Sequence, residues 1–122
     1  AYNAIGDFEN AILEFEKAVK VSNFLGNKQK TSASVNLGRV YSLAGRYQDA
    51  INILEPLLLI YTGDLPNELR EDVIFRLGIS YFSLKKFDAA ERNLAQIRNS
   101  DYAAIVDGTL ALIYMMRGEN YK

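Results

Sequence analysis

The sequence contains neither cysteine nor histidine. A zinc site built from these residues is therefore excluded, and so are a cysteine nucleophile and any catalytic triad that depends on histidine. The absence of cysteine fits a reduced cytosol and a periplasm without disulfides equally well.

An excess of charge of one sign is also missing. The chain has 14 basic and 15 acidic residues, which leave a net charge of -1. Nucleic-acid binders usually carry a basic stripe, so we expect no nucleic-acid partner. The longest apolar run, ILEPLLLIY, is interrupted by Glu55 and Pro56 and is too short to cross a bilayer. We therefore expect no direct membrane insertion.

Residue sets typical of catalysis are not found either. Glu14 and Glu16 point to different faces of a helix, and neighbouring Glu71 and Asp72 diverge too. Solvated helix surface explains these acidic residues best. The sequence has no glycine-rich phosphate loop, no calcium-binding loop and no nucleophile elbow. It therefore predicts a protein that is not an enzyme and uses no metal or cofactor.

What the chain does have is an internal repeat. An apolar stripe with the spacing of one helix face, three, four and three residues, occurs in three copies. The small alanine in each stripe lets another helix approach closely. The stripes are Phe8, Ala11, Phe15 and Ala18; Tyr47, Ala50, Leu54 and Leu57; and Phe87, Ala90, Leu94 and Ile97.

A second pattern precedes these stripes. Leu37, Gly38 and Tyr41 are matched by Leu77, Gly78 and Tyr81, and then by Leu110, Ala111 and Tyr114. A short break and an aromatic residue follow each set, so the unit is helix, tight turn, helix. We expect a helix remnant at 1–5 and helices near 8–25, 27–44, 47–62, 66–84, 87–98 and 101–117. Pro56 should kink the third full helix, or the helix breaks at Glu55; Ser100 is the expected cap of the last helix.

The combined pattern resembles the tetratricopeptide repeat (TPR) family. Ser34 and Ile74 stand where that family often has tryptophan, and two of the repeats are longer than usual. The resemblance implies an all-α fold of TPR-type hairpins stacked in a right-handed superhelix, an α-solenoid. We expect residues 1–122 to form a single TPR domain that is part of a longer chain. Its parts would be a partial repeat at 1–25, full repeats at about 27–63 and 66–98, and a partial repeat at 101–122.

In such a stack the first helix of each hairpin lines a concave wall. Helical spacing places on this wall the residues Val35, Asn36, Arg39, Ser42, Asp72, Phe75, Arg76, Ile79, Phe82, Leu112 and Met115. The apolar members would form a patch that binds a partner's peptide or amphipathic helix, unless neighbouring repeats cover them. Arg39 alone falls where some TPR domains hold a carboxylate-binding set, which speaks against that mode.

The resemblance and the absence of a catalytic set together predict a non-enzymatic scaffold for protein–protein interaction. Its partner would be another protein or peptide, bound in the concave groove. Two alternatives are a regulatory domain that senses a short peptide and a docking segment of a larger enzyme. Leu110, Ala111 and Tyr114 form a stripe that needs a partner helix to pack against, so self-association through the incomplete terminal repeats is a further possibility.

Overall fold

The computed structural model describes residues 4–23, 26–60 and 65–118, and all regular secondary structure in these ranges is helical. The all-α prediction is therefore confirmed. The elements are α1 (Ala4–Ser22), α2 (Asn27–Leu43), α3 (Tyr47–Ile60), α4 (Asn67–Ser83), α5 (Phe87–Leu94), the short 3-10 helix η1 (Ser100–Tyr102) and α6 (Ala103–Met116).

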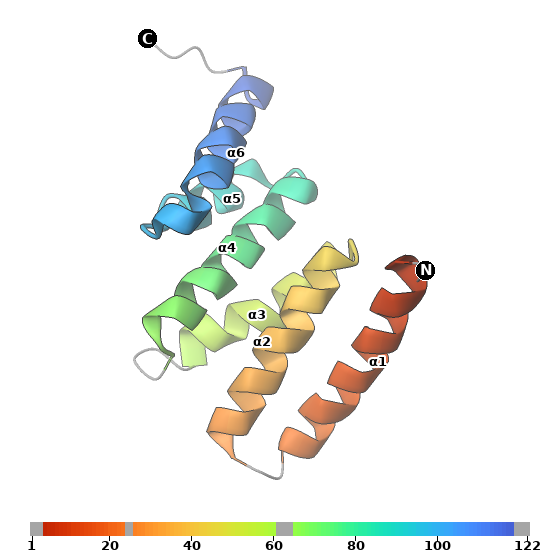
Figure 1. Ribbon diagram of the computed structural model, residues 1–122. Helices are drawn as coiled ribbons and strands as arrows, with labels where there is room; N and C mark the ends of the chain where they lie inside the picture. Colours follow the sequence, from red (N-terminus) through yellow and green to blue (C-terminus); the bar gives the residue numbers. More distant parts are fainter. Residues whose placement is uncertain (1–3, 24–25, 61–64, 119–122) are drawn as a thin grey trace.

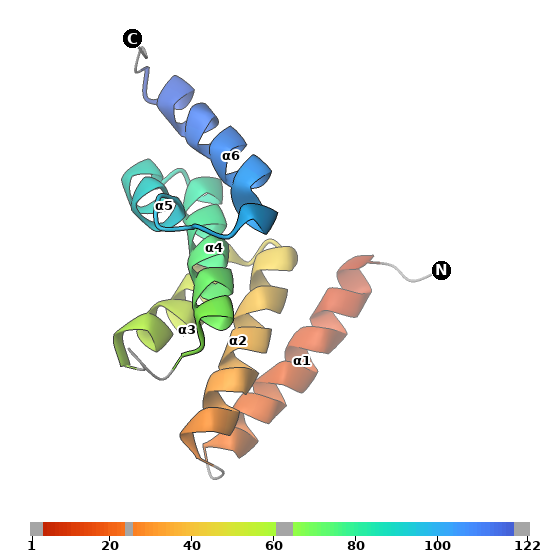
Figure 2. The same cartoon turned by 60° about the vertical axis from the view of Figure 1, so that its left-hand side comes forward.

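Consecutive helices pack against each other from α1 to α6, and α2 also packs against α4. Figure 1 shows α2, α4 and α6 in succession, with α3 and α5 behind them. Turning the molecule shows α1 and α6 at opposite ends of the stack (Figure 2). This alternation of a front and a rear helix is the arrangement of an α-solenoid, whose neighbouring hairpins bury a continuous core.

The α2–α3 and α4–α5 hairpins use the same tight turn. Gly45 has a φ of 81° and Lys85 has a φ of 63°, so both residues adopt the left-handed conformation that ends a helix. The N–H of Arg46 donates to the carbonyl of Tyr41 at 2.8 Å, and that of Lys86 donates to Tyr81 at 2.9 Å. The predicted breaks before Tyr47 and Phe87 are confirmed.

Close helix packing within each hairpin depends on the glycine of the Leu-Gly pair. A Cβ at Gly38 would lie 2.3 Å from a methyl carbon of Leu54, and a Cβ at Gly78 would lie 2.5 Å from one of Leu94. Both leucines are almost fully buried. The Leu-Gly pattern therefore marks where the two helices of a hairpin touch.

Tyrosine joins each hairpin to the one before it. The Tyr41 hydroxyl donates to Glu16 on α1 at 2.6 Å, and the Tyr81 hydroxyl donates to Glu55 on α3. The sequence assigned these tyrosines to the stripe that packs within their own hairpin. Their hydroxyls instead reach back across the stack, so one residue serves both contacts.

Several helix boundaries differ from the prediction. Helix α1 runs without a break through Gly6 and Asp7, so the separate remnant is wrong for residues 4 and 5; residues 1–3 lie outside the described part. Helix α3 continues through Pro56, which excludes a break at Glu55. Proline is tolerated there because its ring faces solvent and water can bond the carbonyl that lost its N–H partner.

The largest difference is at the end of α5. This helix stops at Leu94, four residues before the expected end, and the chain then passes through an extended residue, Asn99, into η1. The Asn99 side chain accepts a hydrogen bond from the N–H of Asp101 at 2.9 Å. Asn99 is therefore the N-terminal cap in this region, and the prediction of Ser100 as the cap is wrong.

Candidate functional site

Four of the predicted wall residues meet where α2 approaches α4. A guanidinium nitrogen of Arg39, Nη2, lies 2.6 Å from Asp72 Oδ2, and the other, Nη1, donates to Asn36 Oδ1 at 3.4 Å. Arg76, one turn after Asp72, places its Nε 3.7 Å from Asp72 Oδ1. One carboxylate is thus shared by two guanidinium groups, which leaves a local excess of positive charge.

Burial strengthens this arrangement. The Asp72 side chain is 12% exposed, whereas those of Arg39 and Arg76 are 38% and 24% exposed. A carboxylate withdrawn from water needs partners of opposite charge, which Arg39 supplies from the neighbouring helix α2 and Arg76 from α4 itself. The arginines keep part of their donor capacity at the surface, where another molecule can reach it.

An aromatic pair lies beside these charges. Phe75 on α4 stacks on Tyr102 of η1 with ring centroids 4.5 Å apart, and the Arg76 guanidinium lies 5.6 Å from the Phe75 centroid. The Tyr102 hydroxyl approaches Asp72 Oδ1 at 3.4 Å. Burial first, and then the negative charge of Asp72, raise the pKa of Tyr102 above its ordinary value. Tyr102 therefore ties η1 to both halves of the cluster.

The sequence missed Tyr102. Its only signal was that the repeat does not account for it, since five of the eight tyrosines occupy repeat positions and Tyr102 does not. The contact depends on the path of the chain between α5 and α6, where α5 ends early. Repeat spacing carries no information about that path.

The predicted wall residues fall into three groups by exposure. Val35, Ser42, Asp72 and Phe75 are buried; Asn36, Arg39, Arg76, Ile79 and Phe82 are half-buried; Leu112 and Met115 are exposed. Phe75, Ile79 and Phe82 pack in one cluster with Val106 and Ile113 of α6. The expected continuous apolar patch is therefore divided, because α6 covers its α4 part and leaves only its own residues, Leu112 and Met115, open to solvent.

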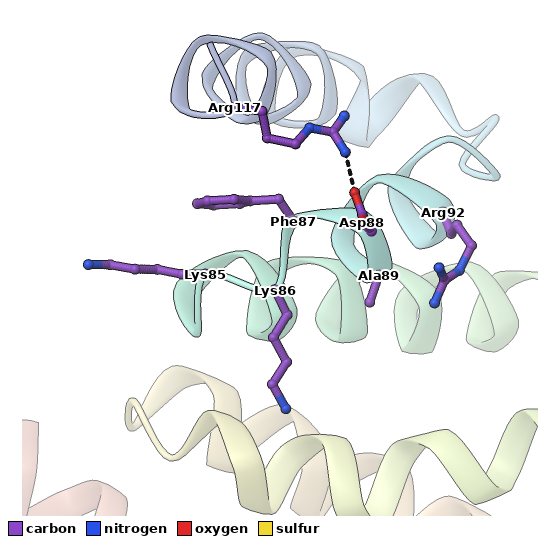
Figure 3. A pocket seen from close by; sticks show the side chains of 7 residues that line it. All are labelled: Lys85, Lys86, Phe87, Asp88, Ala89, Arg92 and Arg117. Atoms are coloured by element: carbon purple, nitrogen blue, oxygen red, sulfur yellow. Dashed lines mark hydrogen bonds and ion pairs between the residues drawn. The ribbon is translucent and has the colours of Figure 1, made fainter. Parts of the chain in front are cut away.

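A cavity of about 460 Å³ lies at the turn between α4 and α5 (Figure 3). It is lined by four basic side chains, but Lys85, Lys86 and Arg92 point in different directions in Figure 3, and Arg117 is paired with Asp88. The second carboxylate bound by Arg117 is Glu91, at 2.6 Å. Basic groups that diverge do not form a binding site for one anion.

The described residues show neither a metal-binding cluster nor a membrane-spanning helix. No group of three or more acidic side chains in these ranges is arranged to hold a metal ion. Among the helices described, none combines the length and the apolar character needed to cross a membrane. The contacts among the described wall residues are hydrogen bonds, ion pairs and ring stacking within the molecule.

The fold defines the class of protein: a stack of helical hairpins whose first helices lie in one row. Two family models described as tetratricopeptide repeat match the chain, at residues 1–24 and 72–101. These matches confirm the resemblance to tetratricopeptide repeats seen in the sequence. No curated protein and no solved structure matches the chain significantly. Repeats of this family generally mediate protein–protein interaction and are typically not catalytic.

Proposed function

We propose that this chain is a non-enzymatic scaffold that binds a partner peptide or helix along the row formed by α2, α4 and α6. The observation that carries the proposal is the cluster around Asp72, where Arg39 and Arg76 remain partly exposed beside an aromatic pair. Exposed Leu112 and Met115 of α6 offer apolar contacts along the same row. A groove with apolar anchors and a few directed polar groups suits a peptide or an amphipathic helix.

The first test removes the charges of this surface in a matched pair. The double variant Arg39→Met/Asp72→Asn takes away both partners of the 2.6 Å ion pair, so neither charge of that pair is left alone, and Arg76, whose side chain is 24% exposed, keeps contact with water. We expect the fold to survive, as circular dichroism will show, and partner recovery in a pull-down to fall by about tenfold, the equivalent of roughly 1.4 kcal/mol.

The control is Arg46→Met/Asp49→Asn. It removes an ion pair of similar length, 2.8 Å, from the α2–α3 turn; its arginine is 39% exposed, like Arg39, and its aspartate, at 44%, is more exposed than Asp72. This variant should recover the partner as well as the unmodified chain does. Equal recovery by both double variants would contradict the proposed surface.

A second copy of the chain is another partner of the proposed kind. The α1–α2 groove and one face of α6 remain uncovered among the described residues, and both are largely apolar.

A further inference from the structure

Two uncovered surfaces lie at opposite ends of the stack. A groove of about 580 Å³ between α1 and α2 has Phe15, Ala18, Val21, Ser32 and Ala33 in its lining. A hollow of about 420 Å³ on α6 is lined by Asp107, Leu110, Ala111, Tyr114 and Met115. Val21 is 57% exposed and Met115 is 73% exposed, so neither surface is closed by the described part of the chain.

The inside of the molecule shows what kind of helix the α1–α2 groove accepts. Helix α2 itself packs against α3 and α4: Gly38 faces Leu54 of α3, and Arg39 binds Asp72 of α4. In the repeat, Phe15 occupies the position of Leu54 and Ser32 occupies that of Asp72. The groove between α1 and α2 is therefore the same kind of surface that already holds a first helix elsewhere in the chain.

The α6 helix is a first helix of that kind. Its residues Leu110, Ala111 and Tyr114 occupy the positions of Leu37, Gly38 and Tyr41 on α2. Within one molecule α6 packs against α5 and η1, and its Ala111 side remains exposed.

From this correspondence we propose that α6 of one copy lies in the α1–α2 groove of a second copy and completes a helical hairpin with its α1. The proposal deepens, and rests on, the self-association included in the proposed function. The partner is a second copy because the chain carries both halves of an interface that it already uses internally.

Charge supports this pairing. Where the internal interface has Arg39 against Asp72, the intermolecular one would have Leu112 against Ser32. The charged side chains of the groove lining, Glu14 and Lys17, pair with each other at 3.3 Å, so no charge is buried without a partner. Helices in a hairpin are antiparallel, so Ala111 against Phe15 places Asp107 opposite the next turn of α1, which carries Lys20. In the other direction, Met115 meets the small residue Ala11.

One difference from the internal hairpin is steric. Ala111 has a Cβ where Gly38 has none, and Phe15 is larger than Leu54. The two helices must therefore lie further apart than α2 and α3 do. A contact between separate copies has this freedom, because no short turn fixes the spacing.

The contact joins two different surfaces, so it is a head-to-tail interface rather than a symmetric one. Such an interface leaves one groove and one α6 face free after each addition, and it produces open chains of copies. A symmetric dimer would use the same surface twice and stop at two copies.

A head-to-tail interface can be tested by mixing two variants, each of which has lost a different one of the two surfaces. Ala18 and Ala111 are both exposed in the monomer, so Ala18→Arg and Ala111→Arg each block one surface without disturbing the core. Sedimentation velocity over a concentration series should show the unmodified chain growing beyond the monomer, and each variant alone remaining monomeric. An equimolar mixture of the two variants should form a dimer and nothing larger, because one intact groove and one intact α6 face remain.

The control is Ala95→Arg, at an exposed alanine just after α5 and away from both surfaces, and it should assemble like the unmodified chain. A chain that stays monomeric at every concentration overturns the proposal, as does a mixture in which the variants do not pair. The variant Arg39→Met/Asp72→Asn should assemble normally. Loss of partner binding is therefore measured with this variant, and loss of self-association with Ala18→Arg and Ala111→Arg.

Discussion

At the scale of single residues, Gly38 and Gly78 set how closely the helices of each hairpin approach. The space that a side chain would need is occupied by the leucine of the facing helix, with distances of 2.3 Å at Gly38 and 2.5 Å at Gly78. Gly108 has the opposite surroundings, since nothing lies within 4 Å of its Cβ position. Gly38 and Gly78 are therefore required by close packing, whereas Gly108 shows only the general cost of glycine in a helix.

Substitution by alanine should therefore have opposite effects at these positions. Gly38→Ala and Gly78→Ala should each lower the free energy of unfolding by about 1–3 kcal/mol, because the added methyl group overpacks a filled site. Gly108→Ala should raise it by roughly 0.8–1 kcal/mol, because alanine is the better helix former. Urea denaturation measures all three variants. A stabilised Gly38→Ala protein would show that the leucine can move aside at no cost.

At the scale of helices, the bridges between tyrosine and glutamate hold successive hairpins together. Glu16 and Glu55 occupy the same position of the repeat, but the third bridge uses Glu91, whose partner is Tyr114 at 2.8 Å. The residue that matches Glu55 on α5 is Ala95, just beyond the end of the helix. The glutamate of the third bridge therefore lies one turn earlier.

These bridges predict a dependence of stability on alkaline pH. Burial first, and then the hydrogen bond to glutamate, raise the pKa of Tyr41 and of Tyr81 from 10.0 to about 12. A raised pKa in the folded state favours the neutral tyrosine. The stabilisation is therefore complete below pH 10 and decreases as the pH rises to about 12, since unfolded tyrosines lose their protons first.

Urea denaturation at a series of pH values in this range measures the effect. The double variant Tyr41→Phe/Tyr81→Phe should lose less stability between the two ends of the series than the unmodified chain does. Tyr47→Phe removes a hydroxyl from the same region without touching a bridge, and it should follow the unmodified chain. Parallel curves for all three proteins would mean that the bridges do not control the alkaline transition.

The sequence predicted these helices well where the repeat is regular. The stripe from Tyr47 to Leu57 locates α3, the stripe from Phe87 to Ile97 locates α5 apart from its last member, Ile97, and the breaks at Gly45 and Lys85 locate their turns. Local periodicity suffices there, because the same side chains define both the helix and the face it buries.

Prediction failed where contacts between hairpins decide the structure. Spacing placed Phe75 on one face of α4 but could not show that Tyr102 and α6 cover that face. The early end of α5 and the path through Asn99 likewise depend on how η1 docks: the backbone N–H groups of Arg98 and Asn99 both donate to Glu71 of α4. These contacts join residues that are far apart in the chain and leave no periodic signal.

At the scale of the whole molecule, the described residues form two hydrophobic clusters that share α4. The first contains Ile12, Leu54 and Leu77 among its buried side chains and joins α1 to α4. The second contains Leu94 and Ile113 and joins α4 to α6. Tyr81 packs against both clusters. In a stack of repeats, stability is the sum of each repeat and its contacts with neighbours, so the two clusters can unfold separately.

Leu54 and Leu94 test this because they are equivalent, nearly fully buried and each in contact with a helix glycine. Leu54→Ala and Leu94→Ala should each cost about 2–5 kcal/mol of local stability, from lost burial and the cavity left behind. Hydrogen exchange should then differ by region. Leu94→Ala should accelerate exchange in α5 and α6 while α1 and α2 keep their protection, whereas Leu54→Ala should expose α1, α2 and α3. Equal acceleration over every helix in both variants would mean that α4 couples the clusters into one cooperative unit, and that the stack unfolds as a whole despite its repeated construction.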